Sequence, residues 1–334
     1  MCVGIASVAR EGVSYLQSAV GSVLEGLSAT EREALYLIVF IAHTNPAEHP
    51  AYLQPWLHAL ADRVFLYDPD ALDIDHVRGL ETPEEKSGAH EKGLLDYTYL
   101  LKECGSINTS YTVMLEDDVV LMGGITGLNT RWRPSNNRPS KRERTFLGWN
   151  SEEWPIYLFS SLLAISGVVA TTTAIRHCLP ATTTYLPNET IALLSVVITP
   201  LLIILFFAAG QATTLPIPAG VHLMPNFGCC SQGLVFPQAR INDLVSWYES
   251  KRAGYVDMLT EDYADQNGET RWALTPCVLQ HVGSKSSKTN SPSRHKNQRT
   301  ASETIWNFRF KEHDVESLRR EHELQKEAEE GLHV

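Results

Sequence analysis

The sequence predicts an α/β protein in which a doubly wound sheet is interrupted by a two-helix transmembrane hairpin. From Met1 to Val120, short apolar runs suited to β-strands alternate with segments of helical periodicity, which is typical of right-handed βαβ units. Two uncharged stretches, 156–174 and 191–209, are each about nineteen residues long, close to the ~20 residues that span a bilayer as a helix. A hairpin returns the chain to the side from which it came, so the parts before and after it can build one domain together.

Composition limits the class of protein. A chain of 334 residues with 43% hydrophobic content is long enough and apolar enough for a sizeable core. Its 28 basic residues against 39 acidic ones give a formal net charge of −11, which argues against nucleic acid as a partner. We expect a first soluble part over 1–150, the hairpin over 156–209, a second soluble part over 210–310 and a charged tail over 311–334.

The first soluble part carries most of the expected sheet. Strands are expected at 3–8, 35–41, 63–67 and 111–115, and helices at 15–27, 50–61 and 82–104. The run 35–41 is apolar throughout, which favours a parallel sheet covered on both faces. The last helix begins at Thr82-Pro83-Glu84-Glu85, where threonine suits the N-cap and proline suits the first helical position.

Three consecutive carboxylates, Glu116, Asp117 and Asp118, follow directly on the apolar run 111–115. Such acids repel one another and resist burial, so they usually lie where something positive is held. In an open α/β sheet, ligands bind at the carboxyl ends of the strands. The pattern therefore indicates a site for Mg²⁺ or Mn²⁺ and the phosphates that it bridges. The alternative is a solvated acidic turn.

Beyond the hairpin, regular structure is expected to resume. A helix is expected at 242–251, an acidic segment at 256–263 and a strand at 278–283 that presents His281 at its end. The polar, basic stretch 284–299 is either a loop that closes over a diphosphate or a solvated linker. The stretch 312–330 predicts a charged helix without a continuous apolar stripe, which we expect to be exposed.

The two apolar stretches have a second interpretation, a pair of buried core helices. The segment 175–190 between them is polar enough for a turn and contains a glycosylation sequon at Asn188. A second sequon lies at Asn108, in the first soluble part. Neither apolar stretch carries an ionisable residue, which argues against a transporter.

Six cysteines occur without a CxxC pair or zinc-ligand spacing. They are Cys2, Cys104, Cys178, Cys229, Cys230 and Cys277. In an oxidising lumen, Cys229 or Cys230 could pair with Cys277 or Cys104. Reduced, buried cysteines are the alternative.

Five short motifs together resemble one group of enzymes. They are Lys92, Asp96-Tyr97, Met114-Leu115-Glu116-Asp117-Asp118, Phe146-Leu147-Gly148 and Gln280-His281-Val282-Gly283. The set resembles GT-A glycosyltransferases related to the N-glycan-branching N-acetylglucosaminyltransferases. A transmembrane hairpin inserted in the catalytic domain is similar to the post-GPI-attachment-to-proteins factor four family. The resemblance covers about Cys2 to Gly283, apart from Met122 to Arg144.

The resemblance implies a function. Members of that family are multi-pass Golgi membrane enzymes with a luminal catalytic domain. They transfer an N-acetylhexosamine, N-acetylgalactosamine in animals, from a UDP-sugar to the core mannose of GPI anchors. The implied cofactor is Mn²⁺ or Mg²⁺, and the implied partners are the UDP-sugar donor, the glycan of a GPI-anchored protein and membrane lipid. On this resemblance the chain is an inverting glycosyltransferase.

The resemblance also implies residue roles. Asp118 and His281 would hold the metal, Glu116 and Asp117 would approach the ribose and nucleotide, and Asp68 and Lys92 would face the nucleotide. For His281 the alternative is a structural residue at a strand end.

An inverting transfer needs a base for the acceptor hydroxyl. The resemblance points to the acidic segment 256–263, and within it to Glu261 or Asp262. The alternative for Glu261 is a residue that flanks a helix.

Two departures from the family pattern bear on these expectations. The stretch Met122 to Arg144 is basic and irregular where family members have a helix and a further strand, and the chain opens at Met1 almost directly on its first strand without a signal peptide. Basic residues before the hairpin outnumber the single Arg176 in its loop, which favours cytosolic soluble parts. The family topology favours the lumen, and we follow the family. The competing functions are an N-glycan-branching transferase and a catalytically inert membrane scaffold.

Overall fold

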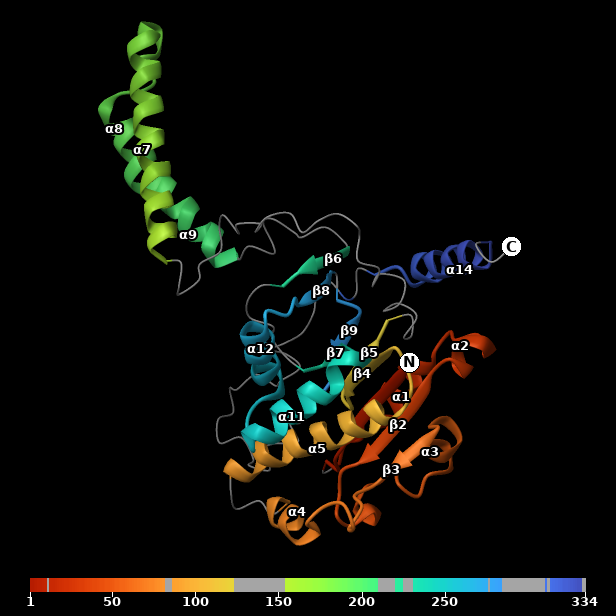
Figure 1. Ribbon diagram of the computed structural model, residues 1–334. Coiled ribbons are helices and arrows are strands. Elements are labelled where there is room, and N and C mark those ends of the chain that lie inside the picture. Colours follow the sequence, from red (N-terminus) through yellow and green to blue (C-terminus); the bar gives the residue numbers. More distant parts are fainter. Residues whose placement is uncertain are drawn as a thin grey trace. The chain divides into compact units, whose positions relative to one another are not determined.

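The fold was analysed in a computed structural model, with elements labelled as in Figure 1. The structure describes residues 1–10, 12–81, 86–122, 154–209, 220–224, 231–275, 277–283, 310 and 313–331. Several expected features lie outside these residues, namely the helix start 82–85, most of 122–144, the motif 146–148, both Cys229 and Cys230, and the basic stretch 284–299. The chain divides into two compact units, one formed by Met1–Ser135 with Ala219–Val334 and the other by Asn136–Pro218.

A five-stranded sheet forms the centre of the first unit. Its strand order is β3-β2-β1-β4-β7. The bounds are Cys2–Ser7 for β1, Tyr36–Ile41 for β2, Arg63–Phe65 for β3, Tyr111–Glu116 for β4 and Gly233–Pro237 for β7. Strands β1 to β4 pair in parallel, whereas β7 runs antiparallel to β4. The predicted α/β class with a parallel-rich sheet is confirmed, and β7 is a strand that the sequence pattern did not predict.

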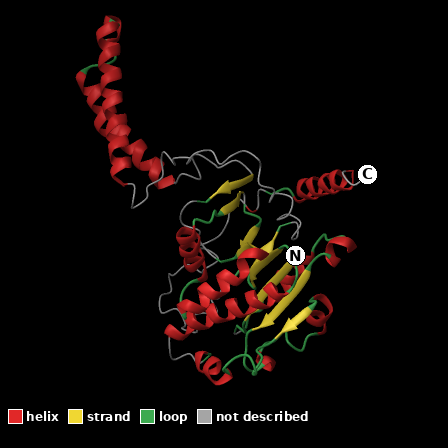
Figure 2. Cartoon of the chain, in the orientation of Figure 1, coloured by secondary structure: helices red, strands yellow, loops and turns green. Residues whose placement is uncertain are grey.

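Helices cover both faces of this sheet (Figures 1 and 2). On one face, α5 (Lys86–Ser106) and α11 (Ile241–Lys251) share a core with Phe40 and Met114. On the other face, α1 (Leu16–Leu24) shares a core with Ile5 and Val113. Successive side chains of a strand point to opposite faces, so the uninterrupted apolar runs supply both cores at once.

The unit contains seven further helices among the described residues. They are α2 (Ala29–Glu33), η1 (Pro46–Glu48), α3 (Pro55–Leu60), α4 (Ile74–Leu80), η4 (Gln238–Arg240), α12 (Val256–Asn267) and α14 (Val315–Gly331). Besides the central sheet, the described part of the chain forms two separate two-stranded antiparallel sheets. One pairs β5 (Val119–Leu121) with β9 (Leu279–His281), and the other pairs β6 (Gly220–Leu223) with β8 (Trp272–Thr275). The helix expected at 50–61 covers only its second half, because Pro55 occupies the first helical position.

A disulfide joins Cys2 of β1 to Cys104 of α5. The expectation that Cys104 pairs with Cys229 or Cys230 is wrong, because Cys104 faces the first strand across the helix–sheet interface. The bond links positions separated by 102 residues, so it ties the amino-terminal strand to the helix that covers it.

The second unit is a helical hairpin. Its elements are α7 (Trp154–Cys178), η2 (Pro180–Thr182), α8 (Asn188–Ala192), the π-helical turn η3 (Leu193–Ile198) and α9 (Thr199–Ala209). Two helical stretches, Tyr157–Cys178 and Asn188–Phe206, are long and apolar enough to cross a membrane, and few of their residues are buried. The alternative of a buried core pair therefore does not describe them. Between them, Arg176 donates to Asn188 Oδ1 at 2.5 Å.

The predicted carboxy-terminal helix is present as α14, but it is not exposed throughout. Leu318 is only 5% exposed, His322 is paired with Glu31 of α2, and Arg319 Nη2 lies 3.8 Å from Glu25 Oε1. One apolar contact and two charged pairs attach the helix to the rest of the unit. The sequence indicated an exposed helix because 312–330 lacks a continuous apolar stripe. These few contacts attach the helix without such a stripe.

Two glycines of α5 test this packing. A Cβ on Gly105 would lie 2.5 Å from Ile241 Cγ2 of α11, whereas a Cβ on Gly93 would meet nothing within 4 Å. We expect Gly105→Ala to destabilise the protein by about 1–3 kcal/mol through overpacking. Gly93→Ala should stabilise the same helix by up to about 1 kcal/mol.

Thermal melting of the purified variants, followed by circular dichroism, measures both effects. The melting temperature should fall for Gly105→Ala and rise for Gly93→Ala. Equal shifts for the two variants would contradict close packing of α5 on α11.

Candidate functional site

The acidic triplet lies at the carboxyl edge of the central sheet. Glu116 is the last residue of β4, and its neighbour across the parallel pairing is Ala6, next to the end of β1. Asp117 and Asp118 form the turn that leads into β5. This is the position predicted from the apolar run that precedes them.

The pairing of β5 with β9 brings His281 to the same place. Val119 is the partner of His281, and the backbone amide of Val282 donates to the carbonyl oxygen of Asp118 at 2.8 Å. Asp118 and His281, which are more than 160 positions apart in the sequence, thus lie next to each other in the structure. Short antiparallel pairing fixes the register, so the histidine can occupy only this position beside the acids.

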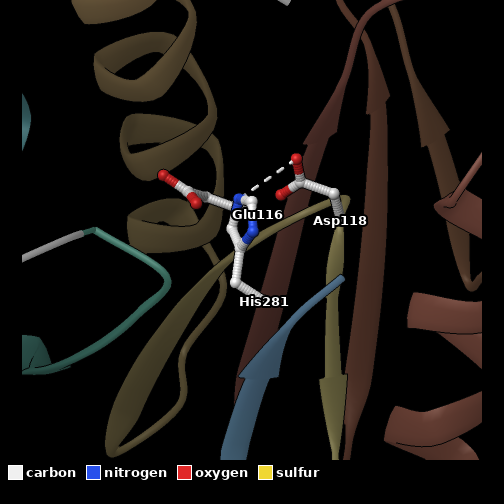
Figure 3. Close-up of side chains that lie close together, drawn as sticks. All are labelled: Glu116, Asp118 and His281. Atoms are coloured by element: carbon white, nitrogen blue, oxygen red, sulfur yellow. Dashed lines mark ion pairs between the residues drawn. The ribbon is translucent and has the colours of Figure 1, made fainter. Parts of the chain in front are cut away.

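Glu116, Asp118 and His281 form a group that could hold a metal ion. One potential ligand atom from each lies within 4.8 Å of the others, and Figure 3 shows the imidazole between the two carboxylates. Asp118 Oδ2 is 3.4 Å from His281 Nε2, and Ser231 Oγ donates to Glu116 Oε1 at 2.6 Å. His281 Nδ1 is buried without a hydrogen-bond partner among the described residues. Two carboxylates, an imidazole and an unsatisfied buried nitrogen suit a divalent cation such as Mn²⁺ or Mg²⁺.

The electrostatics of Asp118 and His281 are coupled. Burial acts to raise the pKa of Asp118, but His281 and Arg10 outweigh it and hold that pKa below its usual value. Burial acts to lower the pKa of His281, but the hydrogen bond to Asp118 and the negative charges of Asp118 and Glu116 raise it above its usual value. In the metal-free protein the histidine therefore takes part of the role of a cation.

Arg10, which sequence reasoning missed, binds the middle acid of the triplet. Its Nη1 lies 2.7 Å from Asp117 Oδ2, its Nη2 lies 2.7 Å from Asp117 Oδ1, and Nη2 is also 3.3 Å from Asp118 Oδ2. Burial raises the pKa of Asp117 even though Arg10 and Ser7 act to lower it. Arg10 follows β1, and the carboxyl end of β1 lies beside that of β4. Its position directly after a predicted strand is the only feature of the sequence that could have indicated a role for Arg10 at this site.

Asp117 has a further contact, with Ser7, which in turn contacts His49. Ser7 Oγ donates to Asp117 Oδ2 at 2.5 Å, and His49 Nε2 lies 3.0 Å from the same hydroxyl. The Ala51 amide donates to His49 Nδ1 at 3.2 Å, so the ring proton of a neutral His49 is on Nε2 and points to Ser7. Burial lowers the pKa of His49 to about 4, with His43 and Arg10 adding to the effect, so the ring is neutral near pH 7.

Lys92 lies on α5 under the carboxyl end of β2. Its Nζ donates to the carbonyl oxygen of Ala42, the hydroxyl of Tyr67 and Asp96 Oδ2, at distances of 2.9, 3.0 and 2.8 Å. These contacts use all three ammonium protons. Tyr67 also donates to Asp96. The structure thus places Lys92 in an internal polar cluster and does not bring it to the Glu116–Asp118–His281 group.

Three further predicted residues lie outside that group. Asp68 is exposed after β3, where its carboxylate accepts from the amide of Asp70 at 2.9 Å. Glu261 lies on α12, with Oε1 2.8 Å from Arg271 Nη1, and Asp262 is exposed on the same helix. The predicted metal residues are thus brought together with Glu116, whereas the predicted bases belong to a separate helix.

Comparison with known proteins places this site in a family. The family described as GPI-N-acetylgalactosamine transferase PGAP4 matches residues 1–280. Three curated relatives match a shorter part. Alpha-1,3-mannosyl-glycoprotein 4-beta-N-acetylglucosaminyltransferase B of Danio rerio is 28% identical over 176 residues, which is 48% of this chain and 28% of the relative. The C enzymes of Sus scrofa and Macaca fascicularis are 28% and 30% identical over 128 and 129 residues, each covering 36% of this chain and 27% of the relative.

The chain thus spans little more than a quarter of the length of the curated relatives that it matches. All three relatives are named as glycosyltransferases. The family match covers most of the chain, including β1, the acidic triplet and β9 up to Gln280. The parallel-rich sheet, the acids at its carboxyl edge and this match lead to one conclusion: the chain belongs to the PGAP4 family of glycosyltransferases.

Proposed function

We propose that the protein is a metal-dependent, inverting glycosyltransferase of GT-A type that moves an N-acetylhexosamine from a UDP-sugar to the mannose core of GPI anchors. By the family's name, the sugar is N-acetylgalactosamine. The observation that carries the proposal is the meeting of Glu116, Asp118 and His281 at the carboxyl edge of the sheet. Ligands of open α/β sheets bind at this edge.

The residues present fit a divalent metal. Asp118 and His281 would hold Mn²⁺ or Mg²⁺, and Glu116, next to them, would approach the ribose and nucleotide. When bound, the ion supplies a Lewis acid that stabilises the negative charge of the departing diphosphate. Ser231 orients Glu116 through its hydrogen bond at 2.6 Å, so this carboxylate is held in place before any ligand arrives.

The nucleotide would lie along the ends of β1 and β4. Among the residues proposed to face it, Asp68 has an exposed carboxylate, whereas Asp117 and Lys92 already have protein partners. A direct contact from Asp117 or Lys92 to the nucleotide would require an exchange of these partners. Asp68, which is exposed, is therefore better supported as a nucleotide contact than Asp117 or Lys92, and Glu116, which accepts a hydrogen bond from Ser231, stays the fourth proposed contact.

The base that accepts the proton of the acceptor hydroxyl would lie on α12. Arg271 Nη1 is 2.8 Å from Glu261 Oε1, so the carboxylate of Glu261 has a fixed direction. Asp262 is exposed and is open to an incoming glycan. An inverting transfer needs one such carboxylate within reach of the acceptor oxygen, and we propose Glu261 or Asp262 for this role.

We propose that the helical hairpin crosses the Golgi membrane and that the first unit lies in the lumen. Both long helices are apolar and exposed, and membrane lipid is the environment that such surfaces require. The disulfide between Cys2 and Cys104 supports an oxidising compartment. A membrane-anchored enzyme also suits an acceptor that is itself anchored by lipid.

The names of the curated relatives favour a second candidate, an N-glycan-branching N-acetylglucosaminyltransferase. The two candidates share a donor class and differ in acceptor. An inert membrane scaffold, the third possibility raised by the sequence, would bind neither Mn²⁺ nor UDP.

The first test is UDP release by the detergent-purified protein from a panel of UDP-sugars, with a synthetic GPI core glycolipid or a biantennary N-glycan as acceptor. We expect release with one N-acetylhexosamine donor, stimulated by the glycolipid and abolished by EDTA. Asp118→Asn should reduce the rate roughly 100-fold or more, because it removes a charged metal ligand. Asp243→Asn, an exposed position on α11 that serves as matched control, should leave the rate unchanged.

Three outcomes would contradict parts of this proposal. Stimulation by the N-glycan alone would favour the branching transferase. Full activity of Asp118→Asn would rule out the proposed metal site. A folded protein that neither releases nor binds UDP would favour the scaffold.

Metal affinity should depend on pH through His281. Because the pKa of His281 is raised in the metal-free protein, the ring binds a proton below that pKa and must release it when the ion binds. We expect Mn²⁺ affinity to fall as the pH is lowered from about 8 to about 6, approaching tenfold per pH unit below the pKa. Titration of Mn²⁺ followed by electron paramagnetic resonance (EPR) measures this, and His281→Gln should bind weakly with a much flatter pH profile. An unchanged profile in that variant would remove His281 from the metal site.

Glycosylation reports the orientation in the membrane. Asn108 lies exposed between α5 and β4, and Asn188 lies exposed at the start of the second long apolar helix, directly after the loop that joins the two. We expect PNGase F to shift the wild-type protein and Asn188→Gln, but not Asn108→Gln, because only a luminal first unit presents Asn108 to the glycosylation machinery. A shift that depends on Asn188 would reverse the proposed topology.

A further inference from the structure

Two adjacent acids compete for the candidate metal site. Asp117 and Asp118 are both buried, at 4% and 6% exposure, and both follow the same strand. Either carboxylate would be attracted by a cation beside Glu116 and His281. The structure distinguishes them: both oxygens of Asp117 bind Arg10, whereas Asp118 Oδ2 lies 3.4 Å from His281 Nε2 and 3.3 Å from Arg10 Nη2.

Arg10 engages both oxygens of Asp117. The distances from Nη1 to Oδ2 and from Nη2 to Oδ1 are both 2.7 Å, so the guanidinium and the carboxylate form a parallel fork. Charge-assisted bidentate pairs of this kind fix geometry as well as energy. The side chains of Arg10 and Asp117 are only 8% and 5% exposed, so water screens the pair weakly.

Ser7 also binds the carboxylate of Asp117, and His49 binds Ser7. Ser7 Oγ donates to Asp117 Oδ2 at 2.5 Å, and the ring proton of His49 points to Ser7 at 3.0 Å. Asp117 Oδ2 therefore receives two hydrogen bonds and Oδ1 receives one. With both oxygens bound to protein donors, Asp117 is held away from the role of a metal ligand.

The loop that carries Arg10 is itself anchored. The Ala9 amide donates to His43 Nε2 at 2.7 Å, and Arg10 pairs with Val13 in an isolated antiparallel bridge. The guanidinium carbon of Arg10 lies 5.5 Å from the centre of the Tyr15 ring, within the range of a cation–π contact. Arg10 thus approaches Asp117 from a fixed position.

The charges are consistent with this division of roles. Glu116, Asp117 and Asp118 carry three negative charges, and Arg10 neutralises one of them. The two negative charges that remain equal the charge of one divalent cation when His281 is neutral. Without Arg10 the buried site would keep an excess negative charge after the ion has bound, which is unfavourable away from water.

We propose that Arg10 is a positioning residue for the metal site: it holds Asp117 in a bidentate pair, to which Ser7 adds a hydrogen bond, and its Nη2 lies 3.3 Å from Asp118 Oδ2. Asp117 is thereby kept on protein donors, and Asp118 is placed as the acid that joins Glu116 and His281 around the ion. The inference rests on the proposed metal-dependent function. It assigns no contact with the substrate to Arg10.

The test measures Mn²⁺ affinity of the purified full chain by EPR titration, independently of activity. Arg10→Lys keeps the charge but cannot form the fork, and Asp117→Asn keeps the shape but cannot accept both bonds. Loss of an orienting partner behind a metal ligand typically costs 10–100-fold in affinity, so we expect at least a roughly tenfold loss in each variant. Ser7→Ala removes one bond from Asp117 and provides a milder variant, expected to lose affinity several-fold, should the first two fail to fold.

A matched control exists in the same unit. Arg32 makes a fork of the same geometry with Asp62, at 2.9 and 3.0 Å, with side chains that are 33% and 28% exposed. Arg32→Lys should leave Mn²⁺ affinity unchanged even where it lowers the melting temperature. This separates a loss of position at the metal from a general loss of stability.

Three results would contradict the positioning role of Arg10 or the metal-dependent function on which it rests. Wild-type affinity in folded Arg10→Lys or in Ser7→Ala would overturn the positioning role. So would unchanged Mn²⁺ affinity with weakened binding of UDP to the Mn²⁺-loaded protein, which would make Arg10 a nucleotide contact. If the wild-type titration shows no Mn²⁺ binding, the proposed metal-dependent function itself is refuted. The other outcomes all require that the wild-type protein binds Mn²⁺.

Discussion

The candidate site depends on the parallel pairing of β1 with β4. That pairing sets Ala6 beside Glu116, and so places the loop after β1 next to the acids after β4. Arg10 and Ser7 can both donate to Asp117 only because the carboxyl ends of β1 and β4 lie side by side. The buried acids are tolerated because Arg10 and His281 lie beside them, since isolated buried carboxylates are costly. Strand pairing and charge pairing therefore support each other at one edge of the sheet.

The interruption of the domain by the helical hairpin adds a second constraint. The two segments of the first unit, Met1–Ser135 and Ala219–Val334, are separated in sequence by a complete second unit. They meet through β4 with β7 and through β5 with β9. The second of these pairings delivers His281 to Asp118, so the metal site is complete only when the segment beyond the hairpin has joined the sheet. The site thus needs residues from both segments of the first unit.

Much of this arrangement could be predicted from the sequence, for physical reasons. The strands β1, β2 and β4 are apolar and short, and the acids and His281 stand at strand ends, where the pattern of the chain changes abruptly. Arg10 and His49 could not be predicted, because a loop residue shows no periodicity and its partner is known only from the tertiary structure. The pairing of Cys104 with Cys2 and the attachment of α14 through Leu318 depend on the same kind of long-range contact. Lys92 was expected to face the nucleotide, and its three internal hydrogen bonds could not be read from the sequence because its partners lie far along the chain or depend on the fold.

The central claim is that a divalent ion is bound by Asp118 and His281 with Glu116 beside it. Pulsed EPR of Mn²⁺ bound to the purified protein tests this most directly, because the spectrum shows magnetic coupling to a nitrogen that ligates the ion. We predict a single coupled nitrogen in the wild-type protein, and its loss in His281→Gln at an Mn²⁺ concentration that still loads the site. Bound Mn²⁺ without nitrogen coupling, or a coupling that persists in His281→Gln, would contradict the proposed metal site.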